Sequence, residues 1–109
     1  MILVTTNDIP GRKVVQVFGM VRGNTVRARN LGRDIMAAFK NMVGGEIDDY
    51  TKLLAESREQ SLDRMIAEAR ARGADAIIGL RFATSEIAQG ASEFLAYGTA
   101  VKLAPQDPH

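Results

Sequence analysis

The feature that most constrains this chain is a set of strand-like segments that are apolar on both faces. In residues 13–21, 76–86 and 92–103, apolar and small residues occupy odd and even positions alike. A sheet with one face in water instead alternates apolar and polar residues along each strand. A sheet built from these segments must therefore be covered on both faces.

Two helical segments can supply one of the covering layers. A short helix is predicted for residues 31–42, between an asparagine N-cap and a Gly-Gly stop. A longer helix is predicted from Asp48 or Asp49 to Arg72, with Gly73 in the position that ends it. At 1.5 Å per residue this helix is about 36 Å long, which matches the length of the strand that follows it. Helix and strand can therefore lie along one another.

The chain is expected to be an α+β protein with a single domain at residues 1–103. Its mainly antiparallel sheet is covered on one face by one short and one long helix, and the last two strands form a hairpin. A turn is expected at Gly23-Asn24, with a short strand extension after it. Residues 104–109 contain two prolines and are expected to form a flexible tail.

The second face of the sheet has no covering layer left within a chain of 109 residues. We therefore expect the chain to associate with itself and to cover this face with another copy. The residues expected at that contact are Ile77 and Gly79 on one strand and Leu95 and Tyr97 on the next. The alternative is that loops and the N-terminal strand cover the face within one molecule.

The order and spacing of several motifs resemble the YbjQ-like family of small bacterial proteins, whose domain carries a heavy-metal-binding label. The resemblance extends from about Ile2 to Leu103. It implies a homo-oligomer, a pentameric ring in which the sheets form a barrel-like centre, and no established reaction. The motifs that carry it include Gly19-Met20-Val21-Arg22-Gly23, Gly73-Ala74-Asp75-Ala76-Ile77-Ile78-Gly79 and Ala96-Tyr97-Gly98-Thr99-Ala100-Val101.

The family carries a heavy-metal-binding label, but this chain has few side chains of the types that bind heavy metals. There is no cysteine, and the one histidine is the last residue, His109. This composition excludes disulfides, zinc–thiolate centres and, within one chain, Ser-His-Asp triads. Glu46, Asp48 and Asp49 remain as candidate ligands for a hard cation, because they lie together around the start of the long helix. The alternative is that an aspartate caps the helix and Glu46 is solvated. The cofactor stays unknown, with a metal ion as its candidate.

A second candidate site is a basic strip. Residues 12–40 contain seven basic side chains and one acidic one, although the net charge of the chain is only +1. Arg22, Arg27, Arg29 and Arg33 could bind an anion or a nucleotide, or they could form a solvated face or pair across a subunit contact. Nucleic acid is disfavoured as a partner because the aromatic residues are few and lie far from this strip.

No pattern in the sequence indicates catalysis. The glycines match neither a phosphate-binding loop nor a dinucleotide fingerprint, and no serine is followed by the lysine of a Ser-x-x-Lys pair. We expect no signal peptide, and no apolar stretch of the sequence is long enough to span a membrane. We expect a cytoplasmic, non-enzymatic module that binds a small ligand or ion, or serves a structural role.

Overall fold

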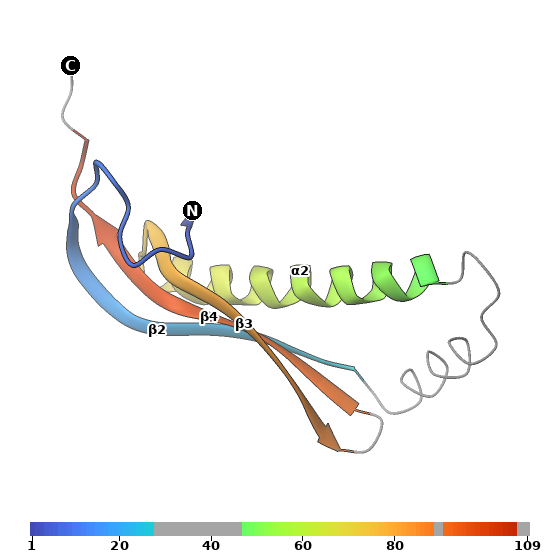
Figure 1. Ribbon diagram of the computed structural model, residues 1–109. Helices are drawn as coiled ribbons and strands as arrows, with labels where there is room; N and C mark the ends of the chain where they lie inside the picture. The colour runs from blue at the N-terminus through green and yellow to red at the C-terminus, as the bar shows by residue number, and fades with distance from the viewer. Residues whose placement is uncertain (28–46, 89–90, 107–109) are drawn as a thin grey trace.

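The computed structural model describes residues 1–27, 47–88 and 91–106, which form one layer of strands and one helix (Figure 1). The sheet has the order β1-β3-β4-β2. β1 runs parallel to β3, and the other neighbours are antiparallel, so the sheet is mixed. This confirms the α+β class. The elements are β1 (Ile2–Leu3), β2 (Val14–Arg27), α2 (Ile47–Ala71), β3 (Ala76–Ala88) and β4 (Ala91–Leu103).

The long helix and the last hairpin are confirmed. α2 spans 25 residues and ends as predicted, since Gly73 has a positive φ of 84°. The N–H of Gly73 donates to the carbonyl of Arg70, and that of Ala74 to the carbonyl of Ala69, which is the pattern of a glycine-terminated helix. The predicted short helix lies outside the described residues. The domain boundary at 103 and the flexible tail stay predictions.

The turn predicted at Gly23-Asn24 is wrong, because β2 continues through it to Arg27. The physical reason lies in the packing of α2. A Cβ atom at Gly23 would lie 2.2 Å from the carbonyl oxygen of Ser61 and 2.4 Å from the backbone nitrogen of Met65. Gly23 is therefore the place where the backbone of α2 rests on the sheet, and not a chain reversal.

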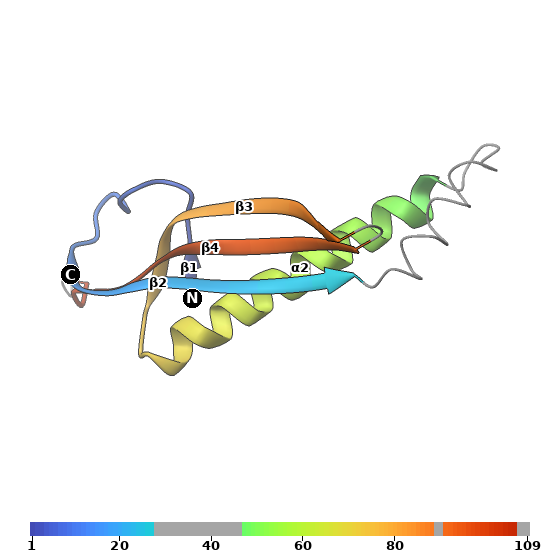
Figure 2. The same cartoon turned by 90° about the horizontal axis from the view of Figure 1, so that it is seen from below.

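A stripe of α2 that repeats every four residues packs against small residues of the sheet. Residues four apart lie on the same helix face, so the stripe is continuous along the helix. It contributes Met65 and Ala69 to a core that also contains Val21, Ala96 and Ala100. Figure 2 shows α2 crossing the sheet obliquely. The fully buried members of the stripe are Ser57, Ser61, Met65 and Ala69.

A β-bulge in β3 changes which residues face the helix. The pairing with β4 shifts register between Ile78 and Arg81, and Gly79 has a φ of 62°. As a result Ile77 and Leu80 both lie in the core beneath α2, whereas Ile78 packs on the other face. The predicted facing of Ile77 is therefore wrong, because strict alternation was carried through a bulge that adds a residue.

Among the described residues, the face of the sheet opposite α2 is covered at one end only. Ala76, Val101 and Leu103 form a second buried cluster there, and Ile2 and Ile9 from the N-terminal segment pack on it. The alternative that loops cover this face is thus correct at that end. Further along the sheet, no part of the chain that the structure describes covers this face.

Candidate functional site

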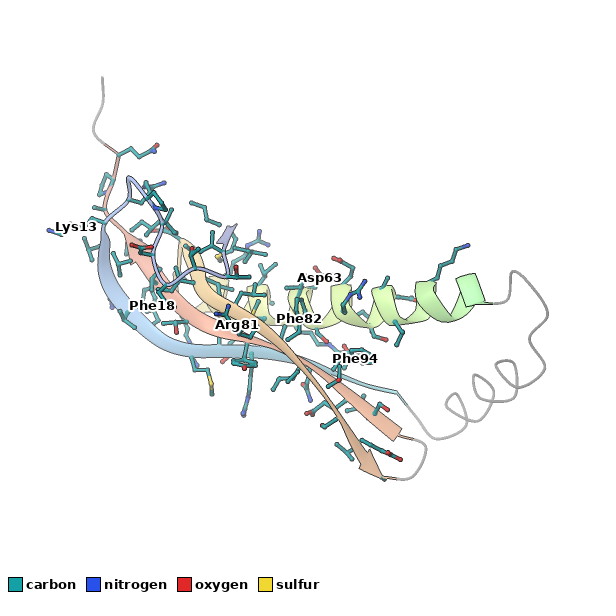
Figure 3. The ribbon with its side chains drawn as sticks, viewed as in Figure 1. Lys13, Phe18, Asp63, Arg81, Phe82 and Phe94 are labelled. Atoms are coloured by element: carbon teal, nitrogen blue, oxygen red, sulfur yellow. The ribbon has the colours of Figure 1, made fainter. Side chains whose placement is uncertain are left out.

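The most exposed part of the described sheet is its last hairpin. We call Arg81–Ala88 of β3, together with Ala91–Leu95 of β4, the β3–β4 arm. Every residue of β3 from Arg81 to Ala88 is exposed, including Phe82 and Ile87. Figure 1 shows the hairpin diverging from α2. Figure 3 shows Phe82 and Phe94 on the side of the hairpin that faces α2.

The outer edge of the arm also lacks a neighbour among the described residues. β1 pairs with β3 only at Ala76 and Ile77. Backbone hydrogen bonds from the N-terminal segment continue as far as Leu80, whose N–H donates to the carbonyl of Val4. Beyond that point β3 is an edge strand, and edge strands present unpaired backbone groups to other chains.

A second uncovered surface lies on the face of the sheet opposite α2. We call it the open face, and it comprises Val17, Met20 and Val26 of β2 with Leu95 and Tyr97 of β4. The three β2 side chains are exposed, and the two from β4 are half-buried. Leu95 and Tyr97 thus lie on the face of the sheet opposite α2, since Ala96 and Ala100 lie beneath the helix. That Gly79, Leu95 and Tyr97 contact another copy stays a prediction.

These two surfaces represent a substantial hydrophobic free energy. Phe82 is 44%, Ile87 54%, Val17 63%, Met20 60% and Val26 49% exposed, so about half of each side chain meets water. Burying a whole side chain of this kind contributes about 1.5–3 kcal/mol, so burying the exposed halves of all five contributes about 4–8 kcal/mol per subunit. The arm alone supplies less than half of that.

The predicted metal site of Glu46, Asp48 and Asp49 stays a prediction. Glu46 lies outside the described residues, and Asp48 and Asp49 lie in the first turn of α2. Among the described residues no group of three or more His, Cys, Asp or Glu side chains could hold a metal ion. Soft heavy metals prefer thiolate and imidazole ligands, and the chain has no cysteine and only His109. Methionine thioethers are therefore the soft donors that remain, without a thiolate or an internal imidazole beside them.

The basic strip is described only in part. Arg22 is exposed on β2, and its backbone N–H donates to the Oε2 atom of Glu68 at 3.0 Å. Arg27 is the last residue of β2, whereas Arg29 and Arg33 lie outside the described residues. Anion binding by these four arginines stays a prediction.

The sequence reasoning missed a different charged group. Arg64 and Glu68 of α2, with Arg72 directly after its last residue, project to the outer edge of β2. Their spacing of four residues places them on one flank of the helix, and this was the signal available in the sequence. We call them the edge row. In the part of the chain described, no helix is both long and apolar enough to cross a membrane.

Comparison with known proteins places the chain in a family. A family model described as "Putative heavy-metal-binding" matches residues 1–104. A UPF0145 protein of Photobacterium profundum is 59% identical, with 94% of this chain and 100% of that protein aligned. One from Archaeoglobus fulgidus is 52% identical, over 94% of this chain and 95% of that protein. The resemblance suggested a bacterial family. Relatives also occur in archaea, so the family is not confined to bacteria.

A solved structure supports the fold alone. It is a DUF74-family protein of unknown function from Pediococcus pentosaceus, with a TM-score of 0.59 and 18% identity. The likeness covers 95% of this chain and 98% of that one. The family model and the close relatives lead to one conclusion: this chain belongs to the YbjQ-like family, UPF0145.

Proposed function

We propose that this chain is the subunit of a homo-oligomeric ring that presents an inter-subunit surface to a small ligand or ion. The observation that carries the proposal is the β3–β4 arm, in which every residue of β3 from Arg81 to Ala88 is exposed. β4 pairs with β2 along Ser92–Leu95, whereas β3 beyond Leu80 has no second neighbour and no cover among the described residues. A second copy that packs on the arm supplies the missing cover.

The energetics favour a contact that joins two different surfaces. Burying the exposed halves of Phe82 and Ile87 contributes only about 1.5–3 kcal/mol, whereas association costs about 4–15 kcal/mol in lost rigid-body freedom. A contact between the arm of one copy and the open face of the next also buries Val17, Met20 and Val26. Such a head-to-tail contact closes into a ring when the rotation between copies allows it. The family resemblance suggests five subunits.

The test is the mass of the protein in solution and its response to a charge on the arm. Five copies of the 11.8 kDa chain have a mass of about 59 kDa, which light scattering after size exclusion distinguishes from smaller species. Phe82→Asp places a carboxylate in the contact, and an unpaired buried charge costs about 3–5 kcal/mol. We expect the dissociation constant to rise at least about 100-fold.

Ala67→Asp is the matched control. Ala67 is exposed on α2, so this substitution adds the same charge at a position away from the arm. An unchanged mass for Phe82→Asp would remove the arm from the contact. Equal dissociation of both variants would indicate a general effect of charge.

For the ligand, we propose a hard cation held by oxygen atoms rather than a soft heavy metal. The support is the donor set, in which Glu46, Asp48 and Asp49 are the candidates and thiolates are absent. Calorimetry with calcium, zinc, copper and cadmium tests this preference. The alternative, an anion or nucleotide on Arg22, Arg27, Arg29 and Arg33, predicts an affinity that falls as salt is added. A non-enzymatic role and a cytoplasmic location stay predictions.

A further inference from the structure

The outer edge of β2 carries backbone groups that a further strand would ordinarily pair. β2 is the last strand of the described sheet, with β4 on its other side. In an antiparallel pair, alternate residues turn their N–H and C=O groups away from the neighbouring strand. On β2 these alternate residues are Phe18, Met20, Arg22 and Asn24. An edge of this kind is a template for strand addition by another chain.

The edge row from α2 contacts all four of these residues. Each contact is a hydrogen bond between a charged side chain and a backbone group, which is stronger than a bond between neutral groups. The contacts are Arg64 Nη1 to the Asn24 carbonyl at 2.5 Å, the Arg22 N–H to Glu68 Oε2 at 3.0 Å, and Arg72 Nη1 to the carbonyls of Met20 and Phe18, both at 3.2 Å.

The spacing of the helix explains why three side chains can serve one strand edge. Residues four apart on a helix are separated by about 6 Å along its axis. Residues two apart on a strand are separated by about 6.6–6.8 Å. Over the two steps from Arg64 to Arg72 the mismatch reaches only about 1.5 Å, which long side chains absorb. The helix runs antiparallel to β2, so successive side chains meet successive edge residues.

The chemistry of the row also matches the edge. The carboxylate of Glu68 accepts from the N–H of Arg22, and the two arginines donate to carbonyls. Glu68 Oε1 also accepts from Arg72 Nη2 at 2.9 Å, an ion pair that fixes both side chains over the strand. One backbone donor of the edge, the Arg22 N–H, thus meets an acceptor, and three backbone acceptors, the carbonyls of Phe18, Met20 and Asn24, meet donors.

We propose that the edge row imitates a strand and closes the β2 edge between Phe18 and Asn24 against addition of a strand from a second copy. The excluded strand is the free outer edge of β3, Arg81–Ala88, which is exposed along its length. Copies then meet by packing on the arm, and not by extending one sheet through β2. The second part of this inference rests on the proposed self-association, whereas the closure of the edge does not.

The test compares two triple variants. Arg64→Ala/Glu68→Ala/Arg72→Ala removes the row. Arg58→Ala/Glu59→Ala/Arg70→Ala removes the same charges from exposed positions of α2 whose side chains make no hydrogen bond or ion pair within the described structure. Alanine favours helix, so neither set lowers helix propensity. Amide hydrogen exchange at Arg22 and solution mass by light scattering are measured for both.

We expect the amide of Arg22 to exchange about tenfold faster or more without the row, and no faster in the control. The mass of the row variant should rise above that of the unsubstituted protein as concentration increases, because β2 then accepts the β3 edge of another copy. Glu68→Ala alone should also speed amide exchange at Arg22. This single variant replaces the triple variant in the test if the triple variant fails to fold. Glu68→Gln keeps an acceptor oxygen and should preserve most of the protection.

Two results would overturn the inference. Unchanged exchange at Arg22 would show that the row does not close the edge. Dissociation of the row variant into smaller species, with the control intact, would place the row inside the subunit contact. A monomeric unsubstituted protein would count against the proposed ring, but the difference between the variant and that protein would still decide whether the edge is closed.

Discussion

Replacing Gly23 by alanine tests how closely α2 rests on the sheet. The new Cβ atom would lie 2.2 Å from the Ser61 carbonyl oxygen, 2.4 Å from the Met65 nitrogen and 2.8 Å from Arg64 Cβ. Two of these atoms are helix backbone, so no side-chain rotation relieves the clash. Because ordinary contacts begin near 3.4 Å, the helix has to withdraw by about 1 Å.

That movement has a cost that can be worked from the contacts it disturbs. Overpacking a core costs about 1–3 kcal/mol or more. The same shift stretches the bonds of the Ser61 hydroxyl to Thr25 Oγ1 and to the Phe94 carbonyl, both 3.1 Å, and each is worth about 1 kcal/mol. We therefore expect a loss of at least about 3 kcal/mol, which in a small domain lowers Tm by roughly 12–24 °C.

Urea and thermal unfolding followed by circular dichroism at fixed protein concentration measure this loss. Gly98→Ala should cost less, because the nearest atom to its new Cβ is the Cγ2 of the Ile77 side chain, at 2.6 Å. Gly73→Ala meets no atom within 4 Å and should cost only the strain of its positive φ, about 1–2 kcal/mol. If Gly23→Ala is as stable as the unsubstituted protein, α2 does not rest on β2 as described.

Further predictions concern the core and the ligand. Met65→Ala should lose about 2–5 kcal/mol in urea unfolding, because Met65 is fully buried in the core between α2 and the sheet; a loss below 1 kcal/mol would contradict that packing. Ser61→Ala should lose about 1–3 kcal/mol in the same assay, since its buried hydroxyl lies within hydrogen-bond distance of the Ser57 and Phe94 carbonyls, to which it donates, and of Thr25 Oγ1. Cadmium should give neither calorimetric heat nor a shift in Tm, and binding at submicromolar concentration would refute the argument from the donor set.

The parts of the fold that could be predicted from the sequence are those fixed by local periodicity. The apolar stripe of α2 repeats over 25 residues and ends at a glycine, so the helix and its end are unambiguous. The last two strands are adjacent along the chain and pair as a hairpin. These features depend on residues close together in sequence, which is why a pattern suffices.

The wrong predictions concern positions where tertiary contacts, and not local sequence, determine the backbone conformation. Gly23-Asn24 has the composition of a turn, but the approach of α2 is what requires a glycine there. The alternation of β3 predicts the face of Ile77 only if no residue is inserted, and the bulge at Gly79 inserts one. The edge row has a visible spacing on the helix, yet its register against β2 follows only from the packing of the two elements.

The candidate sites were less predictable than the fold for a related reason. Glu46, Asp48 and Asp49 are candidate metal ligands because they are neighbours in sequence. The arginines of the basic strip are candidate anion ligands for the same reason. Proximity along the chain does not establish convergence of side chains in space. The exposed arm, in contrast, could be anticipated, because residues apolar on both faces of a strand require cover wherever that strand lies.

Sedimentation equilibrium of the unsubstituted protein over a wide range of concentrations tests the central claim most directly. The account predicts a discrete species of several subunits, about 59 kDa for five copies of the 11.8 kDa chain, that persists on dilution to micromolar concentration. A mass of 11.8 kDa at every concentration would contradict it, because the arm and the open face would then remain in water in a stable single molecule.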